Sequence, residues 1–487
     1  MGDYEQERRM RAERRKRRQD RERKQRIVML IIILVLLSTV VIFFLKAQAK
    51  SSKKTKREPV ITETESASET EISTENIEKE IAQADLLASM YDYDGALQIL
   101  ERLDSQSTNT ELQAKAEEYK MAKESCVAIQ PEDVTHIFYH SLVVDPTRAF
   151  DPGKAGYDGW QQWMVTVTEF DRITQSMYDK GYVLVSIHDL IKKTKNADGT
   201  VAIEPKPVML PPGKKAYVLS LDDLSYYHTY DDRGVASKLL LDEQGKPTCE
   251  YIQADGTVVY GDYDVVPRLD AFIEVHPDAC YRGARGIIAL TGYDGILGYR
   301  TDGVYDEAHN SNPEIYYADT LQLEWLSKHP DFNWEKECED AKKVADAMRE
   351  EGWEFASHTW GHKNVGEAAY DDIVRDNERW MKYVSPLVGG TDAIIFAHGV
   401  DIAGVEGYDN SNQKYVYLKS QGFDIFCNVD STPYRTTISQ EYLRQGRRNM
   451  DGYRIYQDSI STDPLAADLF DAKAVLDPER PLPVPSL

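Results

Sequence analysis

Residues 216–223 read Ala-Tyr-Val-Leu-Ser-Leu-Asp-Asp, an apolar run that ends in two carboxylates. A run of this length and composition is typical of a buried strand, and the acidic pair marks the point where the chain leaves it. Residues 352–362 repeat the arrangement with histidines, as Gly-Trp-Glu-Phe-Ala-Ser-His-Thr-Trp-Gly-His. Because parallel α/β folds carry their functional side chains at the carboxyl ends of strands, both stretches indicate such a fold.

The pattern on either side of these stretches agrees, because strand-like and helix-like periods alternate from about Val134 onward. Strands are predicted at 136–140, 182–185, 216–221, 353–356, 393–397 and 423–429. Helices are predicted at 169–180, 334–351, 370–383 and 415–421. This alternation favours a parallel α/β architecture over residues 132–487, either a barrel or a doubly wound sheet.

The N-terminal part of the chain has a different character. Ile27 to Leu45 is a run of 19 residues without a charged side chain. At about 1.5 Å per residue, such a helix spans the hydrocarbon core of a bilayer. Basic side chains crowd residues 1–26, so the positive-inside rule predicts a cytoplasmic tail, with the chain after residue 45 outside the cell. A cleaved signal peptide is the alternative, with Ala47-Gln48-Ala49 as its site, but the run is longer than the ~7–15 apolar residues of such a peptide.

Two further segments separate this predicted anchor from the α/β region. Residues 46–75 are rich in Ser, Thr, Glu and Lys, and bury too little apolar surface to fold, so a flexible stalk is expected. Residues 76–128 have a helical period that resembles one tetratricopeptide unit. Two interpretations stay open for this helical hairpin, a spacer packed on the next domain and a module that binds a protein partner.

Charge and cysteine content narrow the function classes. The formal net charge is −24, and residues 1–26 hold 12 basic and 6 acidic side chains, so the remainder carries −30. An acidic body of this kind repels phosphate backbones, so nucleic acid is not an expected partner. The 5 cysteines include no C-x-x-C pair, which gives no support to a zinc ribbon or a thioredoxin-type site.

The polar groups at the strand ends have the composition of a metal site. Asp222 and Asp223 follow one predicted strand, while His358 and His362 follow another. If the segment 358–362 turns helically, its two imidazoles face the same side, and with Asp223 they form a two-histidine, one-carboxylate set. Such a set leaves positions for water and substrate, and suits zinc or another divalent metal, with cobalt, nickel and manganese as further candidates.

A second His-x-x-x-His pair, His136 and His140, has a different interpretation. These residues flank Ile-Phe-Tyr in a strand-like run, which separates their Cα atoms by about 13 Å. That separation is too large for both to bind one metal ion.

Together, Ser-Leu-Asp-Asp at 220–223 and His-Thr-Trp-Gly-His at 358–362 resemble the first two motifs of the polysaccharide deacetylase family, carbohydrate esterase family four. The similarity runs from about Val134 to Val475 and implies a distorted (β/α) barrel. It also implies hydrolysis of acetyl groups on N-acetylhexosamine polymers or acetylated xylan. By this resemblance Asp222 is the general base, and Asp223, His358 and His362 are the metal ligands.

The later motifs of the family are altered. The third usually supplies an arginine that orients the base, but this chain has Phe-Ala-His-Gly at 396–399, and Arg300 in the long insert is a candidate replacement. Asp430 matches the fourth motif. The fifth usually ends in an acid histidine, and no histidine follows His398, so His398 is the first candidate acid and His140 the second. Asp430, His140 and Arg300 are also expected to contact substrate.

The expected function is that of a membrane-anchored, zinc-dependent deacetylase acting outside the cell on an N-acetylated glycan such as peptidoglycan or a surface polysaccharide. Two alternatives remain open at this stage. A glycan-binding relative without catalysis would tolerate the missing acid, although it would not need Asp222. An O-acetyl esterase would depend less on an acid, because an alkoxide leaves more easily than an amine.

Overall fold

The computed structural model describes residues 74–106, 110–197, 199–306, 320–430, 432 and 434–487, all within a compact unit that spans Ile72–Leu487. The predicted tail (1–26), the predicted anchor Ile27–Leu45 and all but the last two residues of the predicted stalk (46–75) lie outside the described residues. Within the described ranges, no helix is both long and apolar enough to cross a membrane.

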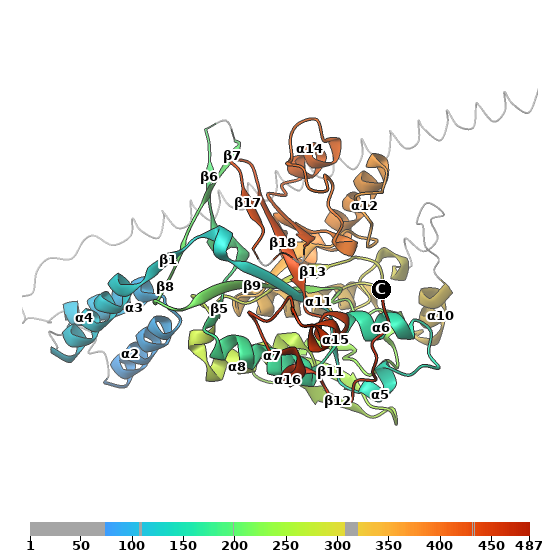
Figure 1. Ribbon diagram of the computed structural model, residues 1–487, viewed down its shortest axis with the longest axis horizontal. Coiled ribbons are helices and arrows are strands. Elements are labelled where there is room, and N and C mark those ends of the chain that lie inside the picture. The colour runs from blue at the N-terminus through green and yellow to red at the C-terminus, as the bar shows by residue number, and fades with distance from the viewer. Residues whose placement is uncertain (1–73, 107–109, 198, 307–319, 431, 433) are drawn as a thin grey trace, which may run out of the picture. The chain divides into compact units, whose positions relative to one another are not determined.

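A closed ring of parallel strands forms the centre of the unit, which confirms the (β/α) barrel (Figure 1). Each strand pairs in parallel with the next, and β13 pairs with β9 to close the ring. In ring order, the strands are β2 Thr135–Tyr139, β9 Lys215–Asp222, β13 Ile287–Leu290, β14 Glu354–Ser357, β15 Ala393–Ile395, β16 Ile425–Val429 and β18 Leu443–Asn449. These strands are buried along most of their length, as expected for a parallel sheet covered by helices.

Helices cover the outside of the barrel and begin at side-chain caps. Thr166 and Glu169 form a capping box on α7, and Asn333 caps α11. On α11, Ala341, Val344 and Met348 are buried at helical spacing against the sheet. The covering helices are α7 Val167–Asp179, α8 Val265–Val275, α11 Trp334–Glu350, α12 Tyr370–Tyr383, α14 Gln413–Ser420, α15 Gly452–Ile460 and α16 Ala472–Val475.

Two barrel strands, β13 and β18, were not anticipated from the sequence, and one predicted strand lies outside the ring. β5 (Tyr182–Leu184) pairs with the first part of β9, from Lys215 to Tyr217. β13 pairs with Ser220 to Asp222 along the same strand. Because β9 is eight residues long, two strands share one of its edges, and only the second continues the ring.

The remaining elements form hairpins and short segments around the barrel. A three-stranded antiparallel sheet, β10 Lys238–Leu241, β11 Pro247–Ile252 and β12 Val258–Gly261, occupies the insert between β9 and β13. Shorter elements are β1 Val127–Ile129, β3 Leu142–Val143, β4 Val165–Thr166, β6 Ile191–Lys195, β7 Val201–Pro205, β8 Val208–Leu210, β17 Thr436–Ile438, α5 Pro146–Ala149, α6 Tyr157–Trp163, α10 Thr320–Lys328 and α13 Ser385–Val388.

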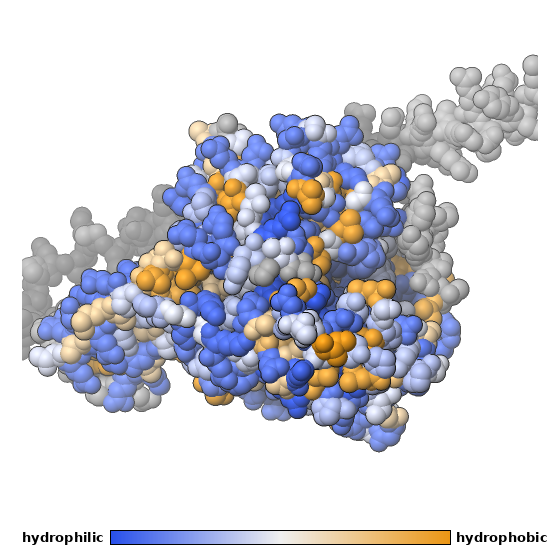
Figure 2. Space-filling model, viewed as in Figure 1, coloured by the Kyte–Doolittle hydropathy of each residue, from blue (hydrophilic) through white to orange (hydrophobic). Residues whose placement is uncertain are grey.

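The N-terminal helices of the described chain are α2 Thr74–Ser89, α3 Tyr93–Gln106 and α4 Thr110–Ser125. They share a small core that includes Ala84, Ala96, Leu100 and Leu112. The turn after α2 contacts the barrel domain, where the Tyr91 hydroxyl donates to the Asp278 carbonyl at 2.8 Å. The face of the molecule in Figure 2 is mostly hydrophilic, with hydrophobic residues in small separate patches, as the acidic composition leads one to expect.

Candidate active site

The interior of the barrel changes from apolar to polar toward the carboxyl end of the strands. Along β9, Ala216 and Val218 belong to the apolar cluster inside the barrel. The period of two then points Ser220 and Asp222 to the same side. Buried His136, on β2, bonds Ser220 Oγ through Nε2 and Gln445 Oε1 through Nδ1, each at 3.0 Å. Burial lowers the pKa of His136 to about 3, so its imidazole is neutral and belongs to the support of the site.

Asp222 is held by an arginine that the sequence analysis did not single out. Arg447, on β18, donates from both terminal nitrogens to the two Asp222 oxygens, at 2.7 and 2.9 Å. Its guanidinium also lies 4.2 Å from the centre of the Phe138 ring. Burial alone raises the pKa of Asp222, but the charge of Arg447 and its hydrogen bonds hold that pKa well below its usual range. Asp222 is therefore an ionised acceptor at the barrel mouth.

His358 has one ring nitrogen committed and one free. Its Nδ1 lies 2.7 Å from the Ile395 carbonyl oxygen. Because a carbonyl can only accept, Nδ1 carries the proton and Nε2 keeps its lone pair. Nε2 faces the carboxylates, 3.9 Å from Asp222 Oδ2. A backbone acceptor that fixes the tautomer in this way is typical of metal-binding histidines.

Asp223 is oriented by a phenol. The Tyr227 hydroxyl donates to Asp223 Oδ1 at 2.7 Å, while Oδ2 faces His362 Nε2 at 3.5 Å. The ring of Tyr227 is itself stacked on Tyr293, with centres 4.5 Å apart and planes 4° from parallel. Tyr227 therefore fixes one carboxylate oxygen and leaves the other directed at the histidines.

The segment 358–362 is a turn rather than a helix, which corrects the expected route by which its imidazoles meet. Thr359 and His362 have φ values of 61° and 49°, in the left-handed region. Asp376, on α12, accepts from the main-chain nitrogens of Trp360 and Gly361 at 2.6 and 2.9 Å and so holds the turn. The His358 and His362 rings then lie with centres 5.1 Å apart.

Backbone strain is concentrated around these ligands. Asp223 and His398 also have positive φ, of 60° and 58°, and none of the four residues is glycine. Left-handed conformations of this kind cost about 1–3 kcal/mol each and gather at functional sites. Such strain at Thr359 is unusual, because a β-branched side chain disfavours it most.

The three predicted ligands come together. One ligand atom from each of Asp223, His358 and His362 lies within 4.8 Å of the other two. The free Nε2 of His358 and the free Oδ2 of Asp223 give the donor types that zinc and related divalent ions prefer. Within the described chain, the side chains present therefore fit a divalent metal.

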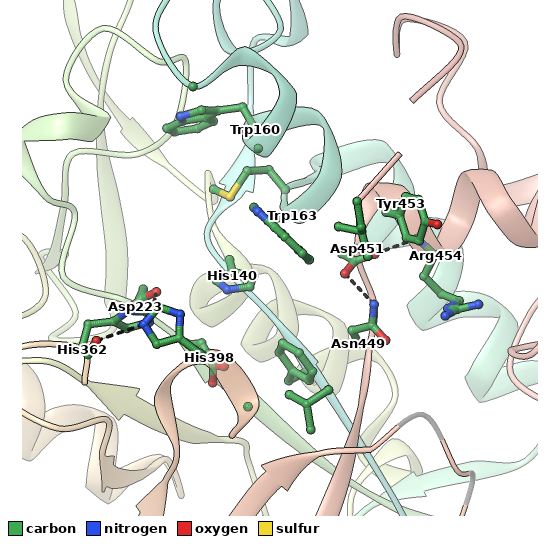
Figure 3. A pocket seen from close by; sticks show the side chains of 18 of the residues that line it. His140, Trp160, Trp163, Asp223, His362, His398, Asn449, Asp451, Tyr453 and Arg454 are labelled. Carbon is green, nitrogen blue, oxygen red and sulfur yellow. Dashed lines mark hydrogen bonds and ion pairs between the residues drawn. The ribbon is translucent and has the colours of Figure 1, made fainter. Parts of the chain in front are cut away.

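A cavity of about 750 Å³ opens over these residues. Figure 3 shows Asp223, His362 and His398 on one side, Asn449, Asp451, Tyr453 and Arg454 on the other, and His140 and Trp163 between them. Trp163 is 42% exposed, an open aromatic face in a cavity. His140, just beyond β2, has a buried Nδ1 that makes no hydrogen bond within the described residues. It lines the same cavity as the carboxylates of Asp222, Asp223 and Asp451.

Of the other three residues expected to act at the site, His398 lies in the cavity lining, whereas Asp430 and Arg300 lie outside it. His398 lines the cavity, exposed, and its Nε2 lies 3.2 Å from the His362 carbonyl. Asp430 is outside the lining residues and pairs with Arg435 at 2.8 Å. Arg300 does not replace the family's arginine, since its guanidinium donates to the Tyr226 carbonyl at 3.0 Å and Arg447 occupies the place beside Asp222.

The strand that contains Arg447 was not predicted, because its sequence is unusually polar. Residues 443–449, Leu-Arg-Gln-Gly-Arg-Arg-Asn, have too many polar side chains to resemble a buried strand. In the barrel, Leu443 belongs to the interior cluster, and Gln445 and Arg447 follow on the same side at a period of two. A strand whose interior side becomes polar toward its carboxyl end is what a site at the barrel mouth requires.

Comparisons with known proteins add little to this. No protein-family model matches the chain, and no curated protein matches it in sequence. Among solved structures, it is similar to "Streptococcus pyogenes deacetylase PplD in complex with acetate", with 13% sequence identity and a TM-score of 0.32. The match covers 66% of this chain and 92% of that chain. The activity of this protein therefore has to be inferred from its own site.

Proposed function

We propose that this protein is a metal-dependent hydrolase that removes acetyl groups from an N-acetylated glycan outside the cell. The observation that carries the proposal is the ligand set Asp223, His358 and His362 beside an ionised Asp222 at the mouth of a parallel barrel. A pure binding site needs no second carboxylate held ready next to the ligands. A zinc ion bound here would polarise the acetyl carbonyl and lower the pKa of a bound water.

The residues around the ligands would serve as general base, proton donor and sugar-binding surface. Asp222, kept in place by Arg447, takes the proton of the attacking water. His140 is the proposed donor to the leaving amine, because its side chain lines the cavity and its Nδ1 has no hydrogen-bond partner among the described residues. His398 is the less suitable donor, since its Nε2–H already points at the His362 carbonyl. The exposed face of Trp163 is placed to pack against a sugar ring.

The test is acetate release by the full-length protein, purified in mild detergent with added zinc or cobalt. Chito-oligosaccharide, peptidoglycan and acetylated xylan separate N-acetyl from O-acetyl substrates. Release should require metal and fall at least about a thousandfold in Asp222→Asn, because that change removes the base. Asp371→Asn, an exposed acid on α12, serves as the matched control.

Other outcomes would assign the chain differently. Release only from acetylated xylan would indicate an O-acetyl esterase. Metal binding without release from any of the three would indicate a glycan-binding relative without catalysis. Where acetate is released, comparing His140→Ala with His398→Ala identifies the proton donor, because only the donor variant should lose kcat while keeping metal affinity.

A further inference from the structure

A second cavity, of about 490 Å³, lies beside the metal cavity, and Tyr230 lines both. Its walls come mainly from the insert between β9 and β13 and from α5, α10 and α11. Among its lining residues are Lys238, Arg300, Trp325 and Glu337. No part of the proposed mechanism uses this cavity, although the shared tyrosine makes it a neighbour of the site.

Arg300 is the unusual group in this cavity. Arg300 is buried, with only 8% of the residue exposed. Its one hydrogen bond from the guanidinium goes to the main-chain oxygen of Tyr226, and no carboxylate of the described chain pairs with it. A buried guanidinium without an ion partner is costly, because its five donors lose water without a charged acceptor in return. Its remaining nitrogens are not among the fully buried unbonded atoms, so they keep access to the solvent of the cavity.

The acidic groups that line the same cavity are already engaged. Glu337 accepts from the Arg300 main-chain nitrogen at 3.0 Å and lies 3.6 Å from Lys238 Nζ. Asp232 pairs with Arg148 at 2.8 Å. The other two acids also have partners: Asp231 lies 3.2 Å from His228 Nδ1, and Glu250 accepts from the Ser237 hydroxyl at 2.8 Å. Of the three arginine and lysine side chains that line the cavity, Arg300 is therefore the one without a carboxylate partner among the described residues.

We infer that this cavity is a subsite for an anionic group of the glycan, a carboxylate or a phosphate ester, which Arg300 binds through its free donors. The inference rests on the proposed function, because the acetylated sugar occupies the metal cavity while the neighbouring unit of the same chain crosses Tyr230. A guanidinium fork matches the paired oxygens of either anion. The substrate is therefore an acidic glycan rather than a neutral one.

Substrate selectivity tests the subsite. We expect wild-type protein to prefer an N-acetylated oligosaccharide with a carboxylate or phosphate on the neighbouring sugar over the neutral oligosaccharide of the same length. Arg300→Met should lower the ratio of kcat/KM values, anionic over neutral, by about 10-fold to 100-fold, the usual effect of losing a charge-assisted hydrogen bond. Arg300→Lys should retain part of the ratio. Arg375→Met, which removes an exposed arginine of α12, is the matched control and should leave the ratio unchanged.

The carboxylate and the phosphate oligosaccharide are tested separately. The group that the subsite binds is the one whose anionic-over-neutral ratio of kcat/KM falls further in Arg300→Met. An unchanged ratio for both would overturn the inference.

A binding measurement keeps this result separate from the proposed activity. Trp325 lines the cavity, so inorganic phosphate and glucuronate should change the tryptophan fluorescence of the wild-type protein in a saturable way. The change should be lost in Arg300→Met and kept in Asp222→Asn, whose substitution lies in the other cavity. If no acetate is released but this pattern holds, the proposed function fails and the subsite stands. If acetate is released but neither anion binds, the subsite fails alone.

Discussion

Each end of the barrel holds a histidine close to two carboxylates, but the two histidines differ in whether a ring nitrogen remains available to bind a ligand. At the amino end, His188 bonds Glu354 through Nδ1 and Asp392 through Nε2, each at 2.9 Å. At the carboxyl end, His358 gives Nδ1 to a backbone carbonyl and keeps Nε2 free. A histidine with both nitrogens committed stabilises a fold, whereas one with a free nitrogen can bind a ligand.

Removing each histidine in turn is the strongest test of this comparison. His358→Ala should weaken zinc binding about a thousandfold, because one of three ligands supplies about a third of a binding free energy on the order of 10–16 kcal/mol. His188→Ala should leave zinc affinity unchanged and lower the thermal midpoint. Competition with a chromophoric chelator measures the first quantity, and thermal unfolding of the metal-free protein the second. Equal losses of zinc affinity in both variants would contradict the distinction.

The next effect concerns the arginine beneath the site. Arg447→Met leaves Asp222 buried and unpaired, so the metal-free protein should lose about 3 kcal/mol of unfolding free energy. Adding Asp222→Asn should recover part of that loss, because the uncompensated charge is then removed. Denaturant unfolding of both single variants and the double variant measures the coupling. Strictly additive losses would show that the pair contributes only through packing.

Much of the fold was predictable, because its signal is local. The apolar runs at 216–221 and 393–397 and the amphipathic periods at 334–351 and 370–383 identify strands and helices without tertiary information. β13 and β18 were missed for different reasons. β13 lies inside a long insert. β18 has polar residues on the side that faces the barrel interior, and they are explained only by the closed barrel, which places them at the site.

The site divides in the same way. Asp223, His358 and His362 follow recognisable strand ends, and the structure brings them together. Their supports, Arg447 and Tyr227, could not be found in this way, since neither lies in a motif. Arg447 is 225 residues from Asp222 along the chain, so only the parallel ring brings the two together. Tyr227 follows Asp223 by four residues, but its contact depends on the left-handed backbone of Asp223.

Tyr227 gives a smaller, more specific test of the carboxyl end. Tyr227→Phe removes the hydroxyl that fixes Asp223 Oδ1, and supports of this kind contribute about 10-fold to 100-fold to metal affinity. Zinc affinity should fall by that factor, and the thermal midpoint of the metal-free protein should also fall, because the same hydroxyl bonds Thr291 Oγ1. Tyr178→Phe is a matched control, because it removes a phenol-to-carboxylate bond of 2.9 Å far from the ligands. An equal loss in the control would show that the effect on metal binding is indirect.

The smallest expected effect belongs to the amino end and depends on pH. Burial lowers the pKa of His188, but its bonds to Asp392 and Glu354 outweigh this and raise it to about 10. Because the folded pKa exceeds the unfolded value of about 6.5, the stabilisation is complete below about pH 6.5 and is lost as pH rises toward 10. With 37% of the side chain exposed, solvent screening limits the effect to about 1 kcal/mol.

The measurement is the difference in unfolding free energy between wild-type protein and His188→Gln from pH 6 to 10. Tyrosines and lysines also titrate in this range, but their contributions are common to both proteins and cancel in the difference. Lys193 also pairs with Asp392, so this carboxylate keeps a partner when His188 loses its proton. The difference should therefore shrink smoothly rather than collapse. A difference that stays constant across the range would mean that His188 is neutral throughout, and that both ends of the barrel hold uncharged imidazoles.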